Sequence, residues 1–387
     1  LADGVGADRA PSWRLALAIE PSSWPSSAML HARQLLHAVQ GVNARAAAWG
    51  ALGAAGLAVA WSRARSEDKM PDAIPPGATE RHRIVVVGGG SAGISVAAQL
   101  LRKLGSANAD LAIVEPADFH YYRPHFTTTA AGLVPYGHAF RPMARVMPRG
   151  ARWIKAAALH FDPEHNVLVL ENGARVEYDF LVVATGMRMD MMQIKGLEAA
   201  LEGDCGVSTI WDYRWVRKVW AGIRNMDHGV ALFTQPRKGR GCGGAPQKIM
   251  WLADDYWRTK TLVRDNVEVE FVTGRDALFP VPKYAEALAE IGVERGVAVS
   301  YNLELVEIDG PNRIATFEDQ HGKRSSRHYD FLHVTPHMGP PAVIANSPLA
   351  DSKSGFVDVN QYTLQHPRFS NVFALGDSAN VPTSRTI

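Results

Sequence analysis

A glycine-rich loop near residue 90 has the composition and spacing that suit a dinucleotide. Gly88, Gly90 and Gly93 stand in the register Gly-x-Gly-x-x-Gly, with Ser91 and Ala92 in the gap between the last two. In such a loop the first glycine allows a tight turn, the second lets the backbone approach a pyrophosphate, and the third allows a helix to pack closely on a strand. The helix that follows would direct its N-terminus at the phosphate charge. These residues predict a dinucleotide site.

The elements that must hold this loop are also indicated by the sequence. The β-branched run Arg83–Val87 predicts a buried parallel strand, and a helix is expected to reach about Leu104. The next apolar run, Leu111–Val114, ends in Glu115, 22 residues beyond Gly93. A carboxylate at that distance is placed to accept hydrogen bonds from a ribose. The strand, the helix and the carboxylate that accompany the glycine pattern in a dinucleotide site are therefore all predicted.

Two later segments indicate which dinucleotide is bound. Tyr178–Val183 predicts a strand that runs into Ala184-Thr185-Gly186, after a hairpin turn at Asn172-Gly173. Asn371–Leu375 predicts another short buried strand, which ends in Gly376-Asp377. Together the segments resemble those of the FAD-dependent disulfide-oxidoreductase superfamily. The resemblance implies FAD as cofactor, with the Asp377 carboxylate at its ribityl or pyrophosphate part. The expected cofactor-binding residues are Gly88, Gly90, Ser91, Ala92, Gly93, Glu115, Thr185, Gly186, Gly376 and Asp377.

The middle of the chain repeats the strand–helix–strand pattern without the chemistry of a nucleotide site. Strands are expected at Gly229–Phe233 and Val267–Val272, with a helix between them that begins at Pro246. The loop before this helix is too long for a phosphate fingerprint, and Pro246 stands where a third glycine would be. The second strand ends at Thr273 with no carboxylate for a ribose. This unit predicts a flavoprotein that is reduced by something other than a nicotinamide.

Cys242 in that loop is the candidate reactive sulfur. It stands among Arg237, Lys238 and Arg240, just before the start of the predicted helix. Nearby positive charge and a helix N-terminus both favour the thiolate, which is the nucleophilic form of cysteine.

The segment Cys242–Met250 resembles the active-site loop of the eukaryote-type sulfide:quinone oxidoreductases. Further segments that resemble this family are Ile113–Pro116, Trp153–Lys155, Ile194–Leu197, Leu332–Pro336, Thr363–His366 and Pro382–Thr386. The resemblance extends from about Arg81 to Ile387. It implies that hydrosulfide attacks a cysteine disulfide, that two electrons pass through FAD to ubiquinone at the membrane, and that a small acceptor takes up the persulfide sulfur. Such exchange needs two sulfurs within reach of each other.

The chain departs from this family in two respects. Ser378 occupies the position of the second active-site cysteine, and Cys205 is the only other thiol that could pair with Cys242. The chain also stops ten residues after Asp377, whereas the family continues through a flavin-contacting helix and a quinone-binding region. We expect either a truncated product or the loss of that region.

The N-terminal segment has the composition of a targeting sequence. No acidic residue occurs from Met29 to Ser66, which contains four arginines and much alanine. This pattern predicts a mitochondrial presequence. The uncharged run Ala46–Ser62 is at the short limit for a membrane anchor. An alternative for Leu1–Ala28 is untranslated sequence that has been read through.

Length and composition complete the expected organisation. A chain of 387 residues suggests two domains, and the net charge of +2 gives no reason to expect a nucleic-acid partner. The histidines lack zinc spacing, so no metal site is expected. We predict an α/β protein with two Rossmann-like domains, the second inserted in the first. The predicted divisions are a leader and linker at 1–80, an FAD domain at 81–228 plus 355–387, and a second domain at 229–354.

These features favour one function over two alternatives. The leading prediction is an FAD-dependent sulfide:quinone oxidoreductase at the mitochondrial inner membrane, with sulfide, ubiquinone and a small sulfur acceptor as its partners. The first alternative is an NAD(P)H:quinone flavoenzyme, which the degenerate second loop disfavours. The other is a catalytically weakened FAD-binding paralogue that serves as a structural or assembly subunit, which Ser378 and the short C-terminus favour.

Overall fold

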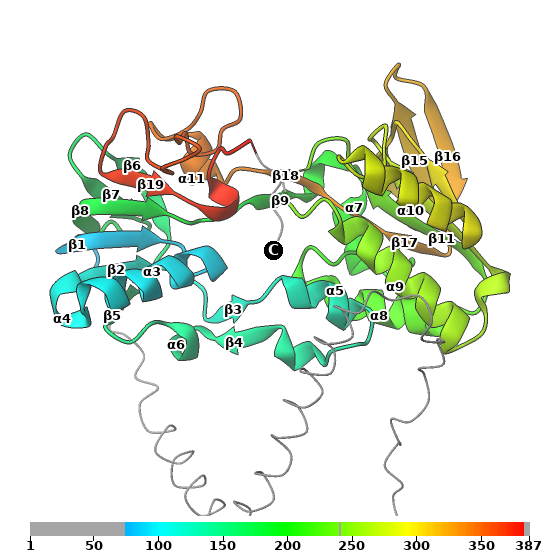
Figure 1. The fold of residues 1–387 in the computed structure, drawn as a ribbon, viewed down its shortest axis with the longest axis horizontal. Coiled ribbons are helices and arrows are strands. Elements are labelled where there is room, and N and C mark those ends of the chain that lie inside the picture. The colour runs from blue at the N-terminus through cyan, green and yellow to red at the C-terminus, as the bar shows by residue number, and fades with distance from the viewer. Residues whose placement is uncertain (1–73, 240, 383–387) are drawn as a thin grey trace, which may run out of the picture. The chain divides into compact units, whose positions relative to one another are not determined.

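The computed structural model describes residues 74–239 and 241–382, which contain both helices and strands (Figure 1). The predicted presequence and the candidate anchor Ala46–Ser62 lie outside these residues. Within the part that the structure describes, none of the helices combines the length and the apolar character of a membrane span.

The first sheet carries the glycine loop and has strand order β5-β2-β1-β8-β7-β6, with β19 paired to the second half of β8. β1, β2, β5, β8 and β19 run parallel to one another, whereas β7 is antiparallel to both β6 and β8. The strands are β1 Thr79–Val87, β2 Leu111–Val114, β5 Ala151–Ile154, β6 Ala158–Asp162, β7 Val167–Leu170, β8 Arg175–Val183 and β19 Val372–Ala374.

The central strand of this sheet is buried on both faces. Val85 and Val87 contribute to one apolar cluster, while Ile84 and Val86 contribute to another on the opposite face. A parallel strand that is covered on both sides must be apolar throughout, which is why this run does not alternate with polar residues. Helix α3, Ser91–Leu104, buries Gly93, Ala97 and Leu101, the stripe that helical spacing places on one face. The strand, the helix and β2 predicted from the sequence are confirmed.

The second sheet is parallel throughout, with strand order β10-β17-β11-β12-β13. Its strands are β10 Val207–Ser208, β11 Gly229–Gln235, β12 Val267–Thr273, β13 Val297–Ser300 and β17 Phe331–His333. Helices α8 Tyr213–Asn225, α9 Ala245–Thr259 and α10 Pro282–Glu294 belong to this part of the chain, and an antiparallel sheet of β14 Leu303–Asp309, β15 Ile314–Asp319 and β16 Arg324–His328 adjoins it. The strand–helix–strand unit predicted in the middle of the chain is confirmed, and α9 begins one residue before Pro246.

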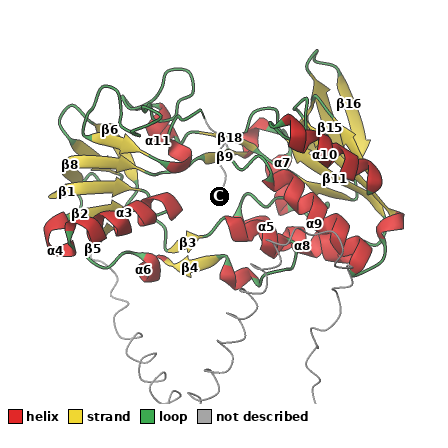
Figure 2. Cartoon of the chain, in the orientation of Figure 1, coloured by secondary structure: helices red, strands yellow, loops and turns green. Residues whose placement is uncertain are grey.

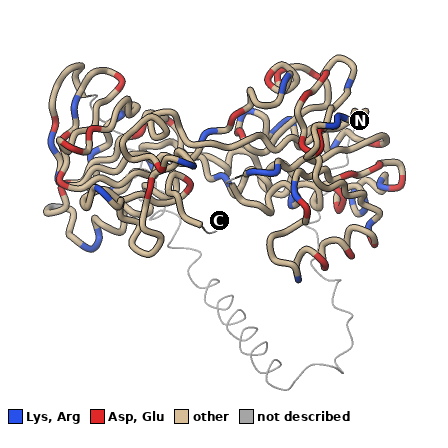
Figure 3. The backbone as a smooth tube through the Cα atoms, turned by 90° about the horizontal axis from the view of Figure 1, so that it is seen from above, with Lys and Arg blue, Asp and Glu red and all other residues tan. Residues whose placement is uncertain are grey.

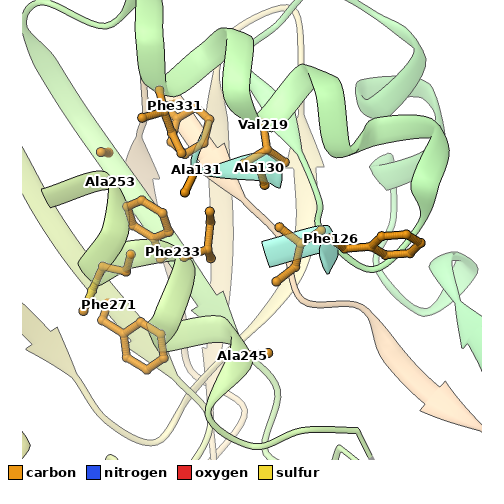
Figure 4. Close-up of a cluster of buried hydrophobic side chains, with 14 of the residues drawn as sticks. Phe126, Ala130, Ala131, Val219, Phe233, Ala245, Ala253, Phe271 and Phe331 are labelled. Atoms are coloured by element: carbon orange, nitrogen blue, oxygen red, sulfur yellow. The ribbon is translucent and has the colours of Figure 1, made fainter. Parts of the chain in front are cut away.

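The core of the second sheet draws on residues from well before position 229. Phe126, Ala130 and Ala131, on and just after helix α5 (Pro124–Ala130), are buried together with Val219 of α8 and Phe233 of β11 (Figure 4). β10 is paired with β17 in the same sheet. Segments expected in the FAD domain thus pack with the second sheet, because apolar side chains far apart in the sequence bury one another. The predicted fold class, α/β with two Rossmann-like units, is confirmed.

Two small antiparallel pairs and several short helices complete the described elements (Figure 2). The pairs are β3 Phe119–Tyr121 with β4 Phe140–Pro142, and β9 Arg188–Asp190 with β18 His337–Gly339. The remaining α-helices are α4 Ser106–Ala109, α6 Met143–Val146, α7 Leu197–Glu202 and α11 Ala342–Ala345. Short 3-10 turns occupy Tyr136–His138, Met191–Gln193, Arg264–Asn266 and Gly376–Ser378. Lysine and arginine are interspersed with aspartate and glutamate along the chain (Figure 3).

Candidate functional site

The glycine loop is packed so tightly that a side chain at Gly88 or Gly93 would collide with the backbone. Gly88 has φ +109°, and a Cβ there would lie 2.4 Å from the carbonyl oxygen of Ala184. A Cβ on Gly93 would lie 1.8 Å from the carbonyl oxygen of Gly88. At Gly90, by contrast, a Cβ would meet nothing within 4 Å. The loop is therefore closed against the sheet at Gly88 and Gly93 and open to a ligand at Gly90.

The surroundings of the loop fit FAD. No side chain caps the start of α3 at Ser91 and Ala92, so its first N–H groups can donate to a phosphate. The Thr185 hydroxyl, in the turn that ends at Gly186, is buried and has no hydrogen-bond partner among the described residues. A buried hydroxyl without a partner is costly, so this atom suits the polar part of a ligand.

Glu115 holds the loop and keeps capacity for a ligand. Its Oε2 accepts a hydrogen bond of 2.7 Å from the Gly89 N–H, and its Oε1 accepts one of 2.7 Å from the Ala117 N–H. Each carboxylate oxygen has a second lone pair, which a ribose hydroxyl could use. Gly376 and Asp377, predicted to bind the cofactor from the other end of the chain, form a 3-10 turn with Ser378 after β19.

Ser378 is fully buried beside the end of β8 in the first sheet. Its Oγ lies 3.0 Å from the carbonyl oxygen of Val183 and 2.9 Å from that of Leu375, so the hydroxyl donates to backbone at the end of β8. The Ser378 side chain thus has a structural role, in addition to standing at the position of the family's second active-site cysteine.

Cys242 is partly exposed and lines a small pocket at one edge of the second sheet. The Lys248 ammonium, one turn into α9, lies 3.7 Å from the Cys242 sulfur. The pocket is lined by Trp211, Gln235, Pro236, Gly239, Gly241, Cys242, Gly243, Pro246, Arg275, Thr335 and Met338.

Hydrogen bonds from β11, from β17 and from the loops after β10 and β17 hold the residues in and around this pocket. The Trp211 indole N–H donates to Thr335 Oγ1 at 3.1 Å, just beyond β17. The Gln235 amide, at the end of β11, donates to the Gly243 carbonyl at 2.9 Å. Burial lowers the pKa of His333 to about 3, so its neutral ring accepts the Ile210 N–H at 3.2 Å. The pocket is therefore preformed around the cysteine loop.

The positive charge near Cys242 differs in origin from the sequence prediction. Arg237 does not line the pocket. Its backbone N–H donates to Glu304 Oε1 at 3.1 Å, and its guanidinium donates to the Gly274 carbonyl at 3.2 Å. Lys238 is exposed and does not line the pocket, and Arg240 lies outside the described residues. Among the described residues, Lys248 and Arg275 place positive charge beside the loop. The Arg237 side chain is engaged by the Gly274 carbonyl and by Glu304, and the thiolate form of Cys242 stays a prediction.

Cys205 lies in a different environment from Cys242. Its Sγ donates to the Ala200 carbonyl at 3.2 Å, and it packs against the apolar cluster that contains Leu197 and Leu201. Cys242 packs against the separate cluster around Trp257. This placement gives no support to a Cys205–Cys242 pair.

In the described part of the chain, β12 does not end in an acid, the usual ribose partner at this position of a nucleotide-binding sheet. β12 ends at Thr273 and continues into Gly274 and Arg275. The nearest acid within the strand, Glu270, is bonded to Arg327 and Ser300. The loop from Pro236 to Gly244 instead surrounds Cys242.

The fold and the glycine loop define the class of protein, a two-dinucleotide-fold flavoprotein. The pattern of the pyridine nucleotide-disulphide oxidoreductase family matches residues 82–226. The X-ray structure of the sulfide:quinone oxidoreductase from Aquifex aeolicus has the same fold, with a TM-score of 0.66 and 20% identity over 78% of this chain and 69% of that one.

Two curated relatives identify the family within this class. The mitochondrial sulfide:quinone oxidoreductase of Dictyostelium discoideum is 42% identical over 85% of this chain and 75% of its own length. That of Mus musculus is 38% identical over 80% of this chain and 68% of its own length. The chain belongs to the sulfide:quinone oxidoreductase family.

Arg275, Trp211, Thr335 and Met338 were not among the predicted site residues. Arg275 follows the carboxyl end of β12 and Thr335 that of β17, on either side of β11. Ligands in parallel sheets bind beyond the carboxyl ends of the strands. The strand ends at Thr273 and His333 could have indicated Arg275 and Thr335, whereas Trp211 and Met338 reach the pocket from distant segments.

Proposed function

We propose that this protein is a mitochondrial, FAD-dependent enzyme that oxidises sulfide and passes two electrons to a quinone. The observation that carries the proposal is Cys242, which lies in a preformed pocket beside Lys248 and Arg275, in a chain of this family.

The first sheet is proposed to hold FAD. Gly90 and the start of α3 take the phosphates, Glu115 takes a ribose, and Thr185 and Asp377 take polar groups of the remaining cofactor. When bound, FAD supplies a two-electron acceptor. The degenerate loop of the second sheet supports reduction by sulfide in place of a nicotinamide.

Cys242 is proposed to carry the sulfur. Joining hydrosulfide to its thiolate forms one S–S bond and releases one proton and two electrons, which leaves a persulfide anion on the side chain. A nucleophilic acceptor anion then bonds to the outer sulfur, the S–S bond breaks, and the Cys242 thiolate returns. The Lys248 ammonium, 3.7 Å from the sulfur, stabilises the thiolate both before the persulfide forms and after the acceptor has removed its outer sulfur. The acceptor is a small nucleophile, because it must reach a partly enclosed sulfur.

Replacing Ser378 with cysteine is expected to speed sulfide-dependent flavin reduction about tenfold, since it restores the family's second thiol. Ser378→Ala is the matched control, because it removes the hydroxyl bond to β8 without adding sulfur and costs about 1 kcal/mol of stability. Stopped-flow absorbance of both variants measures the rates. An unchanged rate in Ser378→Cys would show that a sulfur at this position does not take part.

Association with the inner mitochondrial membrane is proposed because the quinone substrate is held there. The basic segment Met29–Ser66 supports import. A reporter fused behind residues 29–80 is expected in mitochondria, and the full protein is expected to sediment with inner membranes after osmotic lysis. Recovery of the protein in the matrix fraction alone would contradict membrane association.

Two other functions are separated from this one by a single experiment. In an NAD(P)H:quinone enzyme, NADH would bleach the flavin absorbance. In a catalytically weakened subunit, which Ser378 favours, neither sulfide nor NADH would bleach it. Anaerobic titration of the flavin with sulfide and, separately, with NADH therefore tests the proposal.

A further inference from the structure

Arg275 presents an uncompensated positive charge to the pocket that contains Cys242. Its guanidinium lies 3.5 Å from the position that a Cβ on Gly243 would take, and 3.9 Å from that position on Gly239. Its backbone N–H donates to Thr273 Oγ1, and its carbonyl accepts from Asn302. Across residues 74–239 and 241–382, its side chain has neither a hydrogen bond nor an ion pair.

The other partly buried arginines of the second sheet do have acidic partners. Arg258, Arg264 and Arg295 all bind the buried carboxylate of Asp254. Arg327 binds Glu270. A charge withdrawn from water normally needs such a partner. Arg275 is withdrawn enough that burial lowers its pKa, yet a guanidinium stays protonated at neutral pH. It therefore retains a strong capacity to bind an anion.

The pocket favours a small anion. No carboxylate is among the described residues that line it. The space that its described residues enclose is small, about 10 Å³. Arg275, the Cys242 loop and Thr335 all lie beyond the carboxyl ends of neighbouring parallel strands, the edge where such sheets bind ligands.

We propose that Arg275 is a specificity-determining residue that binds hydrosulfide, the anionic form of the substrate, next to the Cys242 sulfur. The choice of hydrosulfide rests on the proposed function, whereas the preference for a small anion rests on the pocket alone. Arg275 raises the local concentration of the anion, and Lys248 acts on the thiolate.

Alkylation of Cys242 in the full-length protein tests this preference without any turnover. Iodoacetate is an anion and iodoacetamide is neutral, and both are of similar size. The reactive thiolate fraction affects both rates alike, so their ratio reports the electrostatic potential at the sulfur. Cys242 is partly exposed, and mass spectrometry of its peptide separates it from Cys205.

Arg275→Gln is expected to lower the iodoacetate-to-iodoacetamide rate ratio about tenfold, since a unit charge is lost a few ångströms from the sulfur. Arg275→Lys should keep most of the native ratio. Lys238→Gln is the matched control, because it removes the same charge from an exposed position in the same loop and should leave the ratio unchanged. If Arg275→Gln loses its native circular dichroism, Arg275→Met removes the same charge with an apolar chain of similar reach.

If the folded Arg275→Gln or Arg275→Met variant keeps the native iodoacetate-to-iodoacetamide rate ratio, the proposal is overturned. Sulfide kinetics form a separate arm, in which Arg275→Gln should raise the KM for sulfide about tenfold with little change in kcat. If sulfide fails to reduce the native flavin while the alkylation ratio still falls, the proposed function is wrong and the anion site stands. If sulfide reduces the flavin and the ratio is unchanged, only the anion site is wrong.

Discussion

Replacing Cys242 with serine is expected to slow sulfide-dependent flavin reduction by at least about a thousandfold. The thiolate is the group that bonds to the substrate sulfur, and loss of a catalytic nucleophile has effects of this size or larger. A serine hydroxyl occupies nearly the same volume, so the pocket and the flavin should be retained. The measurement is the anaerobic decay of flavin absorbance after mixing with sulfide.

Cys205→Ser is the matched control for this experiment. Cys205 packs in the cluster around Leu197 and Leu201, apart from the pocket, so the rate should stay close to native. A loss of rate in Cys205→Ser with a native rate in Cys242→Ser would transfer the reactive role to Cys205. That outcome would contradict the placement of the sulfur chemistry in the α9 loop.

Gly93→Ala and Gly90→Ala each add one methyl group to the glycine loop. We expect the first to lower mainly the stability of the FAD-free protein and the second to lower mainly the affinity for FAD. Gly93→Ala places a Cβ 1.8 Å from the Gly88 carbonyl oxygen, a contact that requires the strand or the helix to move. We expect at least about 1–3 kcal/mol of destabilisation of the FAD-free protein. Gly90→Ala places a Cβ where nothing lies within 4 Å, at an extended backbone conformation that alanine accepts. Its cost to the FAD-free protein should be about 1 kcal/mol or less.

The affinity for FAD should nevertheless fall at least about tenfold in Gly90→Ala, because the methyl group enters the space proposed for the pyrophosphate. Urea unfolding of the FAD-free protein and flavin titration measure the two quantities separately. Native FAD affinity in Gly90→Ala would show that the phosphates do not pass over this loop.

The sequence predicted best what is local and repeated. β1, α3 and β2 combine a β-branched run, spaced glycines and a helical stripe, and all three were found where they were expected. The domain division was harder to foresee. α5 and β10 join the second sheet through partners such as Val219 and Leu332, and nothing near Phe126 or Val207 in the sequence indicates this.

The site shows the same contrast. The position of Cys242 before a helix follows from the local pattern, and the structure confirms it. The local pattern does not predict which charged residues lie beside Cys242. Arg237 bonds to Glu304, whereas Arg275, which follows the neighbouring strand β12, lines the pocket. Proximity in sequence is a poor guide to electrostatics, because side chains respond to partners brought near by the sheet.

The most direct test of sulfide oxidation by Cys242 and FAD is the anaerobic addition of sulfide, and separately of NADH, to the purified protein with FAD bound. We expect sulfide to bleach the flavin absorbance, slowly in the native sequence because of Ser378, and NADH to leave it unchanged. Bleaching by NADH and not by sulfide would contradict the central claim that Cys242 and FAD together oxidise sulfide.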